Sequence, residues 1–249
     1  MAVFLSYAHY YDLLYADKDY SSESDYVFQL IKKYAPTTKS ILNLGCGTGK
    51  HDVFLEKKGF KITGIDLSEE MISRANLQNS QIDFRVGDVR TIQLNKKFDA
   101  VISLFHVACY QNSDHDLISY FNTAANHLNT KGVFIFDVWH GPAVLSDPPV
   151  YKTKEAENDE LKIFRKTSPV MHKEKNIVDV NFSLEVKYKK TGTISKVDEK
   201  HSMRYLFPDE IKNIIKYSNL ELLSSEQWMT GATPSDKTWY VTYVARKID

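Results

Sequence analysis

Short apolar runs alternate with amphipathic segments from residue 21 to residue 139, and this alternation limits the fold more than any other feature of the chain. The runs "SILNL", "KITGID", "IDFRVGD", "FDAVISLF" and "GVFIFDVW" are each typical of a buried strand. Residues 21–35, 50–58, 68–77 and 114–128 instead carry apolar side chains at helical spacing. Strands that alternate with helices in this way predict a mostly parallel sheet with helices on both faces.

The pattern changes after Trp139. Between residues 151 and 204, short β-prone stretches are separated by turn signals such as "TG" at Thr191 and Gly192, which predicts an antiparallel insertion. Pro208 opens a further helix, and "LELLSSEQW" and "KTWYVTYVARK" predict two closing strands. We therefore expect an α/β fold with a seven-stranded, mostly parallel, Rossmann-like sheet, helices on both of its faces, and an antiparallel β insertion after the fifth strand.

Composition and charge narrow the classes of partner. The chain has 249 residues, 43% of them hydrophobic, which is enough for one large core. Lys plus Arg and Asp plus Glu number 32 each, so the chain lacks the positive field that holds nucleic acid or an anionic membrane. No run approaches the roughly 18 apolar residues of a membrane span. Cys46 and Cys109 lack CxxC spacing, and free cysteines suit a reducing compartment. We expect a cytoplasmic protein that binds no metal.

The stretch "ILNLGCGTGKH" places three alternate glycines directly after the first strand. Glycines let a backbone approach a ligand that a Cβ would repel, and the helix that follows offers its free amides. The third glycine of the dinucleotide pattern GxGxxG would stand at position 50, where this chain has Lys50. Asp66 ends the second strand 21 residues after Gly45, where a carboxylate can accept both ribose hydroxyls. The combination indicates an adenosine-containing ligand other than a dinucleotide.

These motifs resemble those of the class I S-adenosylmethionine-dependent methyltransferases from about Ser40 to Asp137. "LNLGCGTG" is similar to their first motif, "GIDLSEEMI" to the segment with the ribose-binding acid, and "FRVGDVRTIQL" to the segment that meets adenine. "FDAVISLFHV" resembles the strand that leads to the active site. The resemblance implies S-adenosyl-L-methionine as cofactor and S-adenosyl-L-homocysteine as product. It departs at Asn43, where many relatives carry an acid, and we expect no direct contact of Asn43 with the cofactor's ammonium group.

The resemblance also implies which residues meet the cofactor. The glycines would pack beside its methionine and ribose parts, Asp66 would hold the ribose, and Asp88 and Val89 would meet the adenine. Leu67 and Met71 either flank the adenine or belong to the core. The full expected set is Gly45, Cys46, Gly47, Gly49, Asp66, Leu67, Met71, Asp88, Val89 and Leu104.

Tyrosines are dense in the N-terminal stretch "YAHYYDLLYADKDY". Tyr7 with Tyr11, and Tyr11 with Tyr15, share one helical face, which predicts either a helix packed on the sheet or a lid over the sulfonium. A "YD-x-x-Y" segment, then "KDY", then an insertion after the fifth strand is similar to the nucleotide-sugar amine N-methyltransferases of deoxysugar pathways, and more distantly to glycine and sarcosine N-methyltransferases. That similarity implies a cofactor lid of Tyr11, Tyr15 and Tyr20, and Tyr110 near the methyl acceptor.

On this basis the chain divides into three parts. We expect a helical lid in residues 1–38, a cofactor-binding core in residues 39–140 and 205–249, and the antiparallel insertion in residues 141–204. The insertion would supply substrate contacts, contacts between the two copies of a homodimer, or both.

Methyl transfer from a sulfonium mainly requires a nucleophile held in line with the methyl carbon, and a base helps a hydroxyl more than a neutral amine. His106 follows "VISLF" at the carboxyl end of a central strand, where open parallel sheets bind ligands, and is our first candidate for a base. His140 follows the fifth strand at the same edge and is the second candidate. His201, in the insertion, faces either the substrate or solvent.

The resemblance favours N-methylation of a small molecule, an amino sugar that is free or nucleotide-linked. The insertion has 13 Lys plus Arg against 9 Asp plus Glu between residues 151 and 204, which suits a phosphate or is simply a solvated sheet face. Two alternatives stay open. One is O-methylation of a sugar or other small-molecule hydroxyl with His106 as base, and the other is a non-catalytic binding protein on the same fold.

Overall fold

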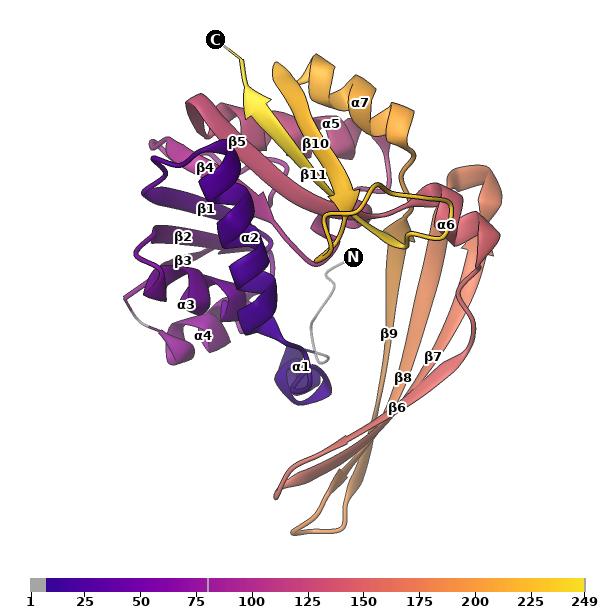
Figure 1. Ribbon diagram of the computed structural model, residues 1–249. Coiled ribbons are helices and arrows are strands. Elements are labelled where there is room, and N and C mark those ends of the chain that lie inside the picture. The colour runs from indigo at the N-terminus through magenta and orange to yellow at the C-terminus, as the bar shows by residue number, and fades with distance from the viewer. Residues whose placement is uncertain (1–7, 80, 249) are drawn as a thin grey trace.

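The computed structural model describes residues 8–79 and 81–248, and Tyr7 of the tyrosine-rich stretch lies outside them. Figure 1 shows two β-sheets, a central one with helices on both sides and a long one that projects away from it. Among the described residues, no helix is long and apolar enough to cross a membrane.

The central sheet is built from seven strands in an order that reverses beside the first strand. They are β1 (Ser40–Leu44), β2 (Lys61–Asp66), β3 (Asp83–Val86), β4 (Phe98–Ser103), β5 (Leu128–Trp139), β10 (Leu220–Gln227) and β11 (Tyr240–Lys247). Their order is β10-β11-β5-β4-β1-β2-β3. β1 to β5 run parallel, and β11 runs antiparallel to both of its neighbours. The predicted seven-stranded, mostly parallel sheet is therefore confirmed.

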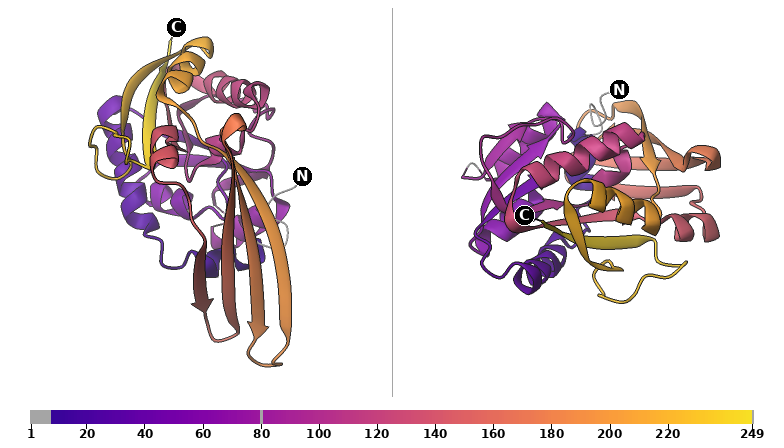
Figure 2. Two further views of the ribbon diagram at one scale, coloured as in Figure 1. Left: turned by 90° about the vertical axis from the view of Figure 1, so that its right-hand side faces the viewer. Right: turned by 90° about the horizontal axis from the view of Figure 1, so that it is seen from above.

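Helices cover both faces of this sheet, as Figure 2 shows from above. α2 (Tyr20–Tyr34), α3 (Lys50–Lys57) and α4 (Glu69–Gln78) pack on one face, and α5 (Asp114–Asn126) and α7 (Pro208–Tyr217) pack on the other. Successive strand residues alternate between the two layers, so that Ile41 contacts the α2 side and Leu42 the α5 side. Both are fully buried, and each such burial is worth about 1.5–3 kcal/mol.

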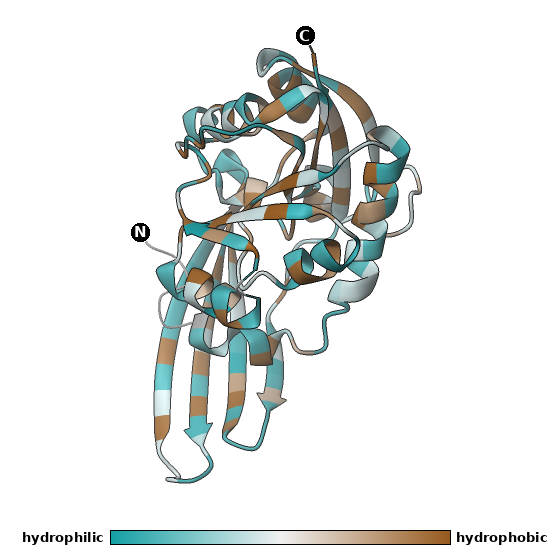
Figure 3. Ribbon diagram, turned by 90° about the vertical axis from the view of Figure 1, so that its left-hand side faces the viewer, coloured by the Kyte–Doolittle hydropathy of each residue, from teal (hydrophilic) through white to brown (hydrophobic). Residues whose placement is uncertain are grey.

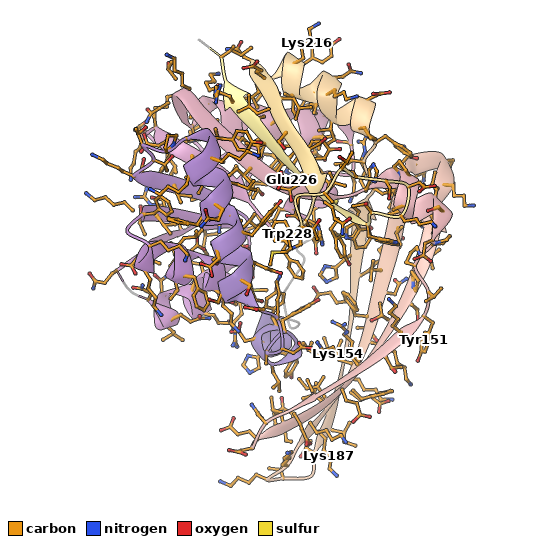
Figure 4. All side chains as sticks on the ribbon, viewed as in Figure 1. Tyr151, Lys154, Lys187, Lys216, Glu226 and Trp228 are labelled. Atoms are coloured by element: carbon orange, nitrogen blue, oxygen red, sulfur yellow. The ribbon has the colours of Figure 1, made fainter. Side chains whose placement is uncertain are left out.

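The predicted insertion forms a separate four-stranded antiparallel sheet, called here the second sheet. Its strands are β6 (Lys152–Glu157), β7 (Leu161–His172), β8 (Ile177–Tyr188) and β9 (Ile194–Arg204), and α6 (Gly141–Ser146) precedes them. Figure 3 shows apolar and polar bands alternating along these strands, as expected for a sheet with one covered face. Lys187 lies near the tip farthest from the central sheet (Figure 4).

The helix α1 (Ala8–Leu14) packs on the second sheet. Tyr10 and Leu14 are buried against Ile163 and Leu184. Just beyond α1, Asp17 accepts hydrogen bonds from the Nζ of Lys154, which Figure 4 places beside this helix. The sequence left open whether this helix packs on the sheet or covers the ligand, and the sheet on which it packs is the second one.

One predicted boundary was wrong. The helix expected to reach Leu128 ends at Asn126, with His127 as its C-terminal cap, and Leu128 already belongs to β5, where it pairs with Phe98. The Nδ1 of His127 lies 2.7 Å from the carbonyl oxygen of Thr123, while its Nε2 accepts the backbone N–H of Leu94. These bonds hold the chain as it leaves the helix, and helical spacing cannot reveal them.

Candidate functional site

A cavity of about 590 Å³ opens at the carboxyl ends of β1, β2, β4 and β5. This is the edge where open α/β sheets bind ligands, and the volume lies in the usual range for small-molecule sites. Every residue of the expected site lines it except Gly49 and His140. The expected residues that line it are Tyr11, Tyr15, Tyr20, Gly45, Cys46, Gly47, Asp66, Leu67, Met71, Asp88, Val89, Leu104, His106 and Tyr110.

The glycine loop follows β1 and leaves room on one side. Gly45 has φ +83°, and a Cβ there would lie 2.4 Å from Cγ2 of Val107. Gly47 has φ +56°, and a Cβ there would meet no heavy atom within 4 Å, so the open side of the loop is at Gly47. Gly49 differs from our expectation: it caps α3, and its Cβ would meet Phe84 at 2.5 Å, so this glycine is required by packing beneath the loop.

Asp66 stands at the end of β2 with both carboxylate oxygens fixed. One oxygen accepts the backbone N–H of Gly47 at 2.8 Å, and the other accepts that of Ser68 at 2.9 Å. Burial raises the pKa of this carboxyl, and the backbone amides of Ser68, Gly47 and Leu67 oppose that rise. Each oxygen keeps a second lone pair, so the group fits a pair of adjacent ribose hydroxyls.

Asn43 lies below the loop and does not line the cavity. Its Nδ2 donates to both oxygens of Asp52, at 2.9 and 3.0 Å, and both side chains are buried. Burial raises the pKa of Asp52 to about 7. The side-chain amide of Asn43 therefore donates its hydrogen bonds to the buried carboxyl of Asp52.

Asp88 lines the cavity beside Val89, and the Arg90 guanidinium bonds its carboxylate. This pairing lowers the pKa of Asp88, so the carboxylate is ionised at neutral pH. Arg90 also bonds Asp116, and both of these residues line the cavity. Leu67 is 54% exposed at this end, whereas Met71 is 2% exposed and adds a buried apolar surface.

α1 is tied to the glycine loop through one carboxylate. An oxygen of Asp12 accepts the Thr48 hydroxyl at 2.9 Å and lies 3.1 Å from the Nζ of Lys50. The ring of Tyr11, on α1, lies 4.6 Å from the ring of Tyr15, which directly follows the helix, and both residues line the cavity. Lys50, which breaks the dinucleotide spacing, thus holds the tyrosine-bearing helix against the loop.

His106 lines the cavity and is backed by a buried carboxylate. Its Nδ1 lies 2.5 Å from Oδ2 of Asp137, a residue at the end of β5 that is 2% exposed. The backbone N–H of His106 also donates to Asp137. Phe105 and His106 both have φ +66°, a conformation that costs roughly 1–2 kcal/mol per residue and that often marks functional segments.

Tyr110 ends the 3-10 helix η1 (Val107–Tyr110), and its hydroxyl lies 2.7 Å from Nδ1 of His201 on β9. Both residues line the cavity, so the question whether His201 faces substrate or solvent is answered in favour of the cavity. Sequence reasoning did not single out Asp137 as a partner of His106. The acid that ends the apolar run "VFIFD" is the feature that could have indicated it.

His140 does not line the cavity, contrary to our expectation of a second base. Its side chain is buried, its Nδ1 lies 3.1 Å from the Thr238 carbonyl oxygen, and burial lowers its pKa. The residue caps α6 and bridges to Leu206, so it belongs to the joint between the central sheet and the chain that returns from the second sheet.

Comparison with known proteins agrees with this geometry. A family model described as a methyltransferase domain matches residues 41–132. The chain is 31% identical to a dTDP-3-amino-3,4,6-trideoxy-alpha-D-glucopyranose N,N-dimethyltransferase of Streptomyces venezuelae, over 57% of the chain and 61% of that relative. The chain thus spans less than two thirds of the length of this relative.

Two solved structures are similar over nearly the whole chain. An S-adenosylmethionine-dependent methyltransferase from Clostridium acetobutylicum has a TM-score of 0.82 at 26% identity and covers 98% of both chains. The sugar N-methyltransferase KedS8 from Streptoalloteichus has a TM-score of 0.84 at 17% identity, covers 100% of this chain and 95% of its own, and shares the fold. Residues 41–132 therefore match a methyltransferase domain, and the chain has the fold of an S-adenosylmethionine-dependent methyltransferase.

Proposed function

We propose that this protein methylates the amine of a small amino sugar, free or nucleotide-linked, with S-adenosylmethionine as methyl donor. The observation that carries the proposal is that one cavity joins two kinds of surface. The glycine loop and Asp66 supply a nucleoside surface at one end. The second sheet supplies a polar acceptor surface that includes His201, Lys200 and Ser202. The name of the Streptomyces venezuelae relative, an amino-sugar N,N-dimethyltransferase, points to the same acceptor class.

The chain's own groups have separate tasks in this scheme. When bound, S-adenosylmethionine supplies an electrophilic methyl group. Asp66 would hold the ribose hydroxyls, and Gly47 would let the loop approach the cofactor. Tyr11, Tyr15 and Tyr20 would cover it and exclude water. Positioning of this kind can contribute up to about 7–11 kcal/mol to lowering a barrier.

The three parts expected from the sequence take these roles in the proposal. Of the lid expected in residues 1–38, the described residues 8–20 act as the lid, residues 39–140 and 205–249 form the cofactor core, and residues 141–204 hold the acceptor. α2 packs on the central sheet as part of the core layer. The basic excess of the second sheet supports a phosphate-bearing acceptor, and light scattering would test whether two copies pair through this sheet.

O-methylation is the second candidate, and the pairing of His106 with Asp137 favours it. A carboxylate 2.5 Å from Nδ1 favours the proton on that nitrogen, which leaves Nε2 free to accept the proton of a hydroxyl. This pair is the arrangement that an alcohol acceptor needs and a neutral amine does not.

The deciding experiment is an acceptor panel. Amino sugars with and without a linked nucleotide, the corresponding hydroxyl sugars and simple amines are incubated with S-adenosylmethionine, and release of S-adenosylhomocysteine is measured. Mass spectrometry then identifies the methylated atom. We expect turnover with amino sugars, and no more than a small effect of His106→Ala on their rate.

Each other outcome selects a different function. Methylation of an oxygen, lost in His106→Ala while cofactor binding is intact, would establish O-methylation instead. Absence of S-adenosylmethionine binding by calorimetry at millimolar concentration would favour the non-catalytic binding protein.

A further inference from the structure

We propose that Arg90 and Asp116 make the cavity selective for a purine with an amino group at position 6, because they fix the carboxylate of Asp88. The inference rests on the proposed function, since it takes the bound nucleoside to be S-adenosylmethionine, and it assigns the residues that distinguish adenine from related bases. In this scheme Asp88 contacts the base, whereas Arg90 and Asp116 are positioning residues.

The base of a bound nucleoside would lie at the end of β3. In the sheet, β2 stands between β1 and β3, and β4, which leads to His106 and Tyr110, lies beyond β1. A nucleoside with its ribose at Asp66 and its methyl group toward His106 and Tyr110 therefore directs its base away from them. The segment after β3 lines the cavity on that side with Asp88 and Val89.

Three N–H groups of Arg90 hold the carboxylate of Asp88. Its Oδ1 accepts the backbone N–H and the Nε–H of Arg90, both at 2.9 Å, and its Oδ2 accepts an Nη2–H at 2.6 Å. The Nε atom also lies 3.1 Å from Oδ2. A guanidinium fork of this kind fixes the plane of a carboxylate as well as its charge. Asp88 therefore lines the cavity in one orientation.

Arg90 is itself held by α5. Its Nη1 donates to Oδ1 of Asp116 at 2.9 Å, and its carbonyl oxygen accepts the Thr123 hydroxyl at 2.9 Å. Asp116 is fixed in turn by Ser113, whose hydroxyl donates to its Oδ2 at 2.9 Å. A single, partly exposed ion pair would contribute little. Here several bonds converge on one guanidinium, so the network sets a direction for Asp88 rather than only a charge.

This geometry suits a base that donates a hydrogen bond. An ionised carboxylate accepts hydrogen bonds and donates none. Pairing with Arg90 lowers the pKa of Asp88, so its carboxylate stays ionised at neutral pH. The 6-amino group of adenine donates N–H bonds, whereas the 6-oxo group of hypoxanthine only accepts them. The carboxylate therefore favours adenine over hypoxanthine, and the preference depends on the orientation that Arg90 imposes.

Calorimetry with S-adenosylhomocysteine and S-inosylhomocysteine measures this selectivity without an acceptor. The wild-type protein should bind the adenine compound more tightly. Arg90→Gln should weaken that binding by about 10-fold and hardly change the affinity for the hypoxanthine compound, which makes no such bond. Arg90→Lys should do the same, because an ammonium group cannot form the fork. In turnover, Arg90→Gln should raise KM for S-adenosylmethionine and leave kcat unchanged.

Arg85→Gln is the matched control. Arg85 bonds Asp83 with the same two nitrogens, Nε at 2.8 Å and Nη2 at 2.9 Å, but neither residue lines the cavity. This variant should bind both compounds as the wild type does. Asp116→Asn should reduce the selectivity less than Arg90→Gln, and it should add nothing in the Arg90→Gln background, because Asp116 acts through Arg90.

Equal weakening of both compounds by Arg90→Gln would overturn the inference, because it would mean general damage to the site, and so would an unchanged affinity ratio. Should Arg90→Gln fail to fold in a thermal scan, Arg90→Lys and Asp116→Asn decide the question by the same ratio. A protein that methylates amines but binds both compounds equally would overturn only this inference. One that prefers the adenine compound and methylates no amine would overturn only the proposed function.

Discussion

Three glycines with positive φ allow the close packing at the cofactor loop to be measured. Gly45 (φ +83°), Gly47 (φ +56°) and Gly59 (φ +92°) share a conformation that L-residues rarely adopt. A Cβ at Gly45 would lie 2.4 Å from Val107, whereas one at Gly47 or Gly59 would meet no heavy atom within 4 Å. Gly47 lines the cavity and Gly59 does not. Replacing each of them by alanine therefore separates three effects: backbone strain at all three positions, steric overlap at Gly45, and intrusion into the cavity at Gly47.

The expected magnitudes follow from these contacts. Left-handed backbone costs alanine roughly 1–2 kcal/mol at each site. The loss of unfolded-chain entropy offsets about 0.4–1 kcal/mol of this, equally in all three variants. Gly45→Ala adds an overlap with Val107 that requires a shift of η1. We expect this variant to lose about 1–3 kcal/mol more free energy of unfolding than either of the others.

Urea unfolding of the three variants measures the differences, and calorimetry with S-adenosylmethionine measures binding. Gly47→Ala and Gly59→Ala should be equally stable, but Gly47→Ala should bind the cofactor more weakly because its methyl group enters open space beside the ligand. Gly59→Ala is the control that carries strain alone. Equal stability of Gly45→Ala and Gly59→Ala would refute the argument from Val107, and unchanged binding by Gly47→Ala would refute the assigned cofactor position.

Three further predictions concern carboxylates. Asp66→Asn should weaken S-adenosylmethionine binding by about 10- to 100-fold, since hydrogen bonds to charged groups are worth about 1.5–3 kcal/mol, and calorimetry that finds equal affinity would contradict this. Asp12→Asn should weaken binding by a few-fold at low salt and less at high salt, because the pair with Lys50 is partly exposed; a salt-independent effect would exclude the ion pair as the cause. Burial raises the pKa of Asp52 in the folded state to about 7, above its unfolded value, so stability falls as pH rises between about 4 and about 7. Asp52→Asn should therefore stabilise the fold at about pH 8 by a few kcal/mol and hardly at all at about pH 4, measured by urea unfolding, and the same gain at both pH values would mean that Asp52 ionises normally.

The central sheet could be predicted from the sequence because its information is local. Each apolar run, such as "KITGID", predicts one strand, and the amphipathic segment after it predicts one helix. Parallel topology then places the carboxyl ends of the strands at the same edge of the sheet. The error at Leu128 arose where the last helical turn and the next strand share apolar residues, so that periodicity cannot place the boundary. Side-chain bonds to the chain around His127 decide it.

The residues of the site also divide into those that local sequence patterns predict and those that they do not. Gly45, Asp66 and Asp88 lie at the carboxyl ends of β1, β2 and β3, and their place at one sheet edge was predictable because each ends or follows an apolar run. His140 also follows a strand at that edge, yet its ring is buried away from the cavity lining, since position along the chain does not fix side-chain surroundings. Gly49 was also misjudged from the sequence, because the side chain packed against it, Phe84, comes from β3, which is distant along the chain.

The end of the cavity proposed for the acceptor is formed where the two sheets meet. Local sequence patterns do not predict how two sheets pack against each other. Tyr110 and His201 are 91 residues apart, and they meet because Val178 and Met203 anchor the second sheet in the main core. Farther along, the same sheet packs against α1, and Asp12 of α1 bonds the cofactor loop. α1 is thus held by the donor end and the acceptor end of the cavity together. In the proposed function, the helix that covers the methyl donor would therefore also contact the sheet that carries His201.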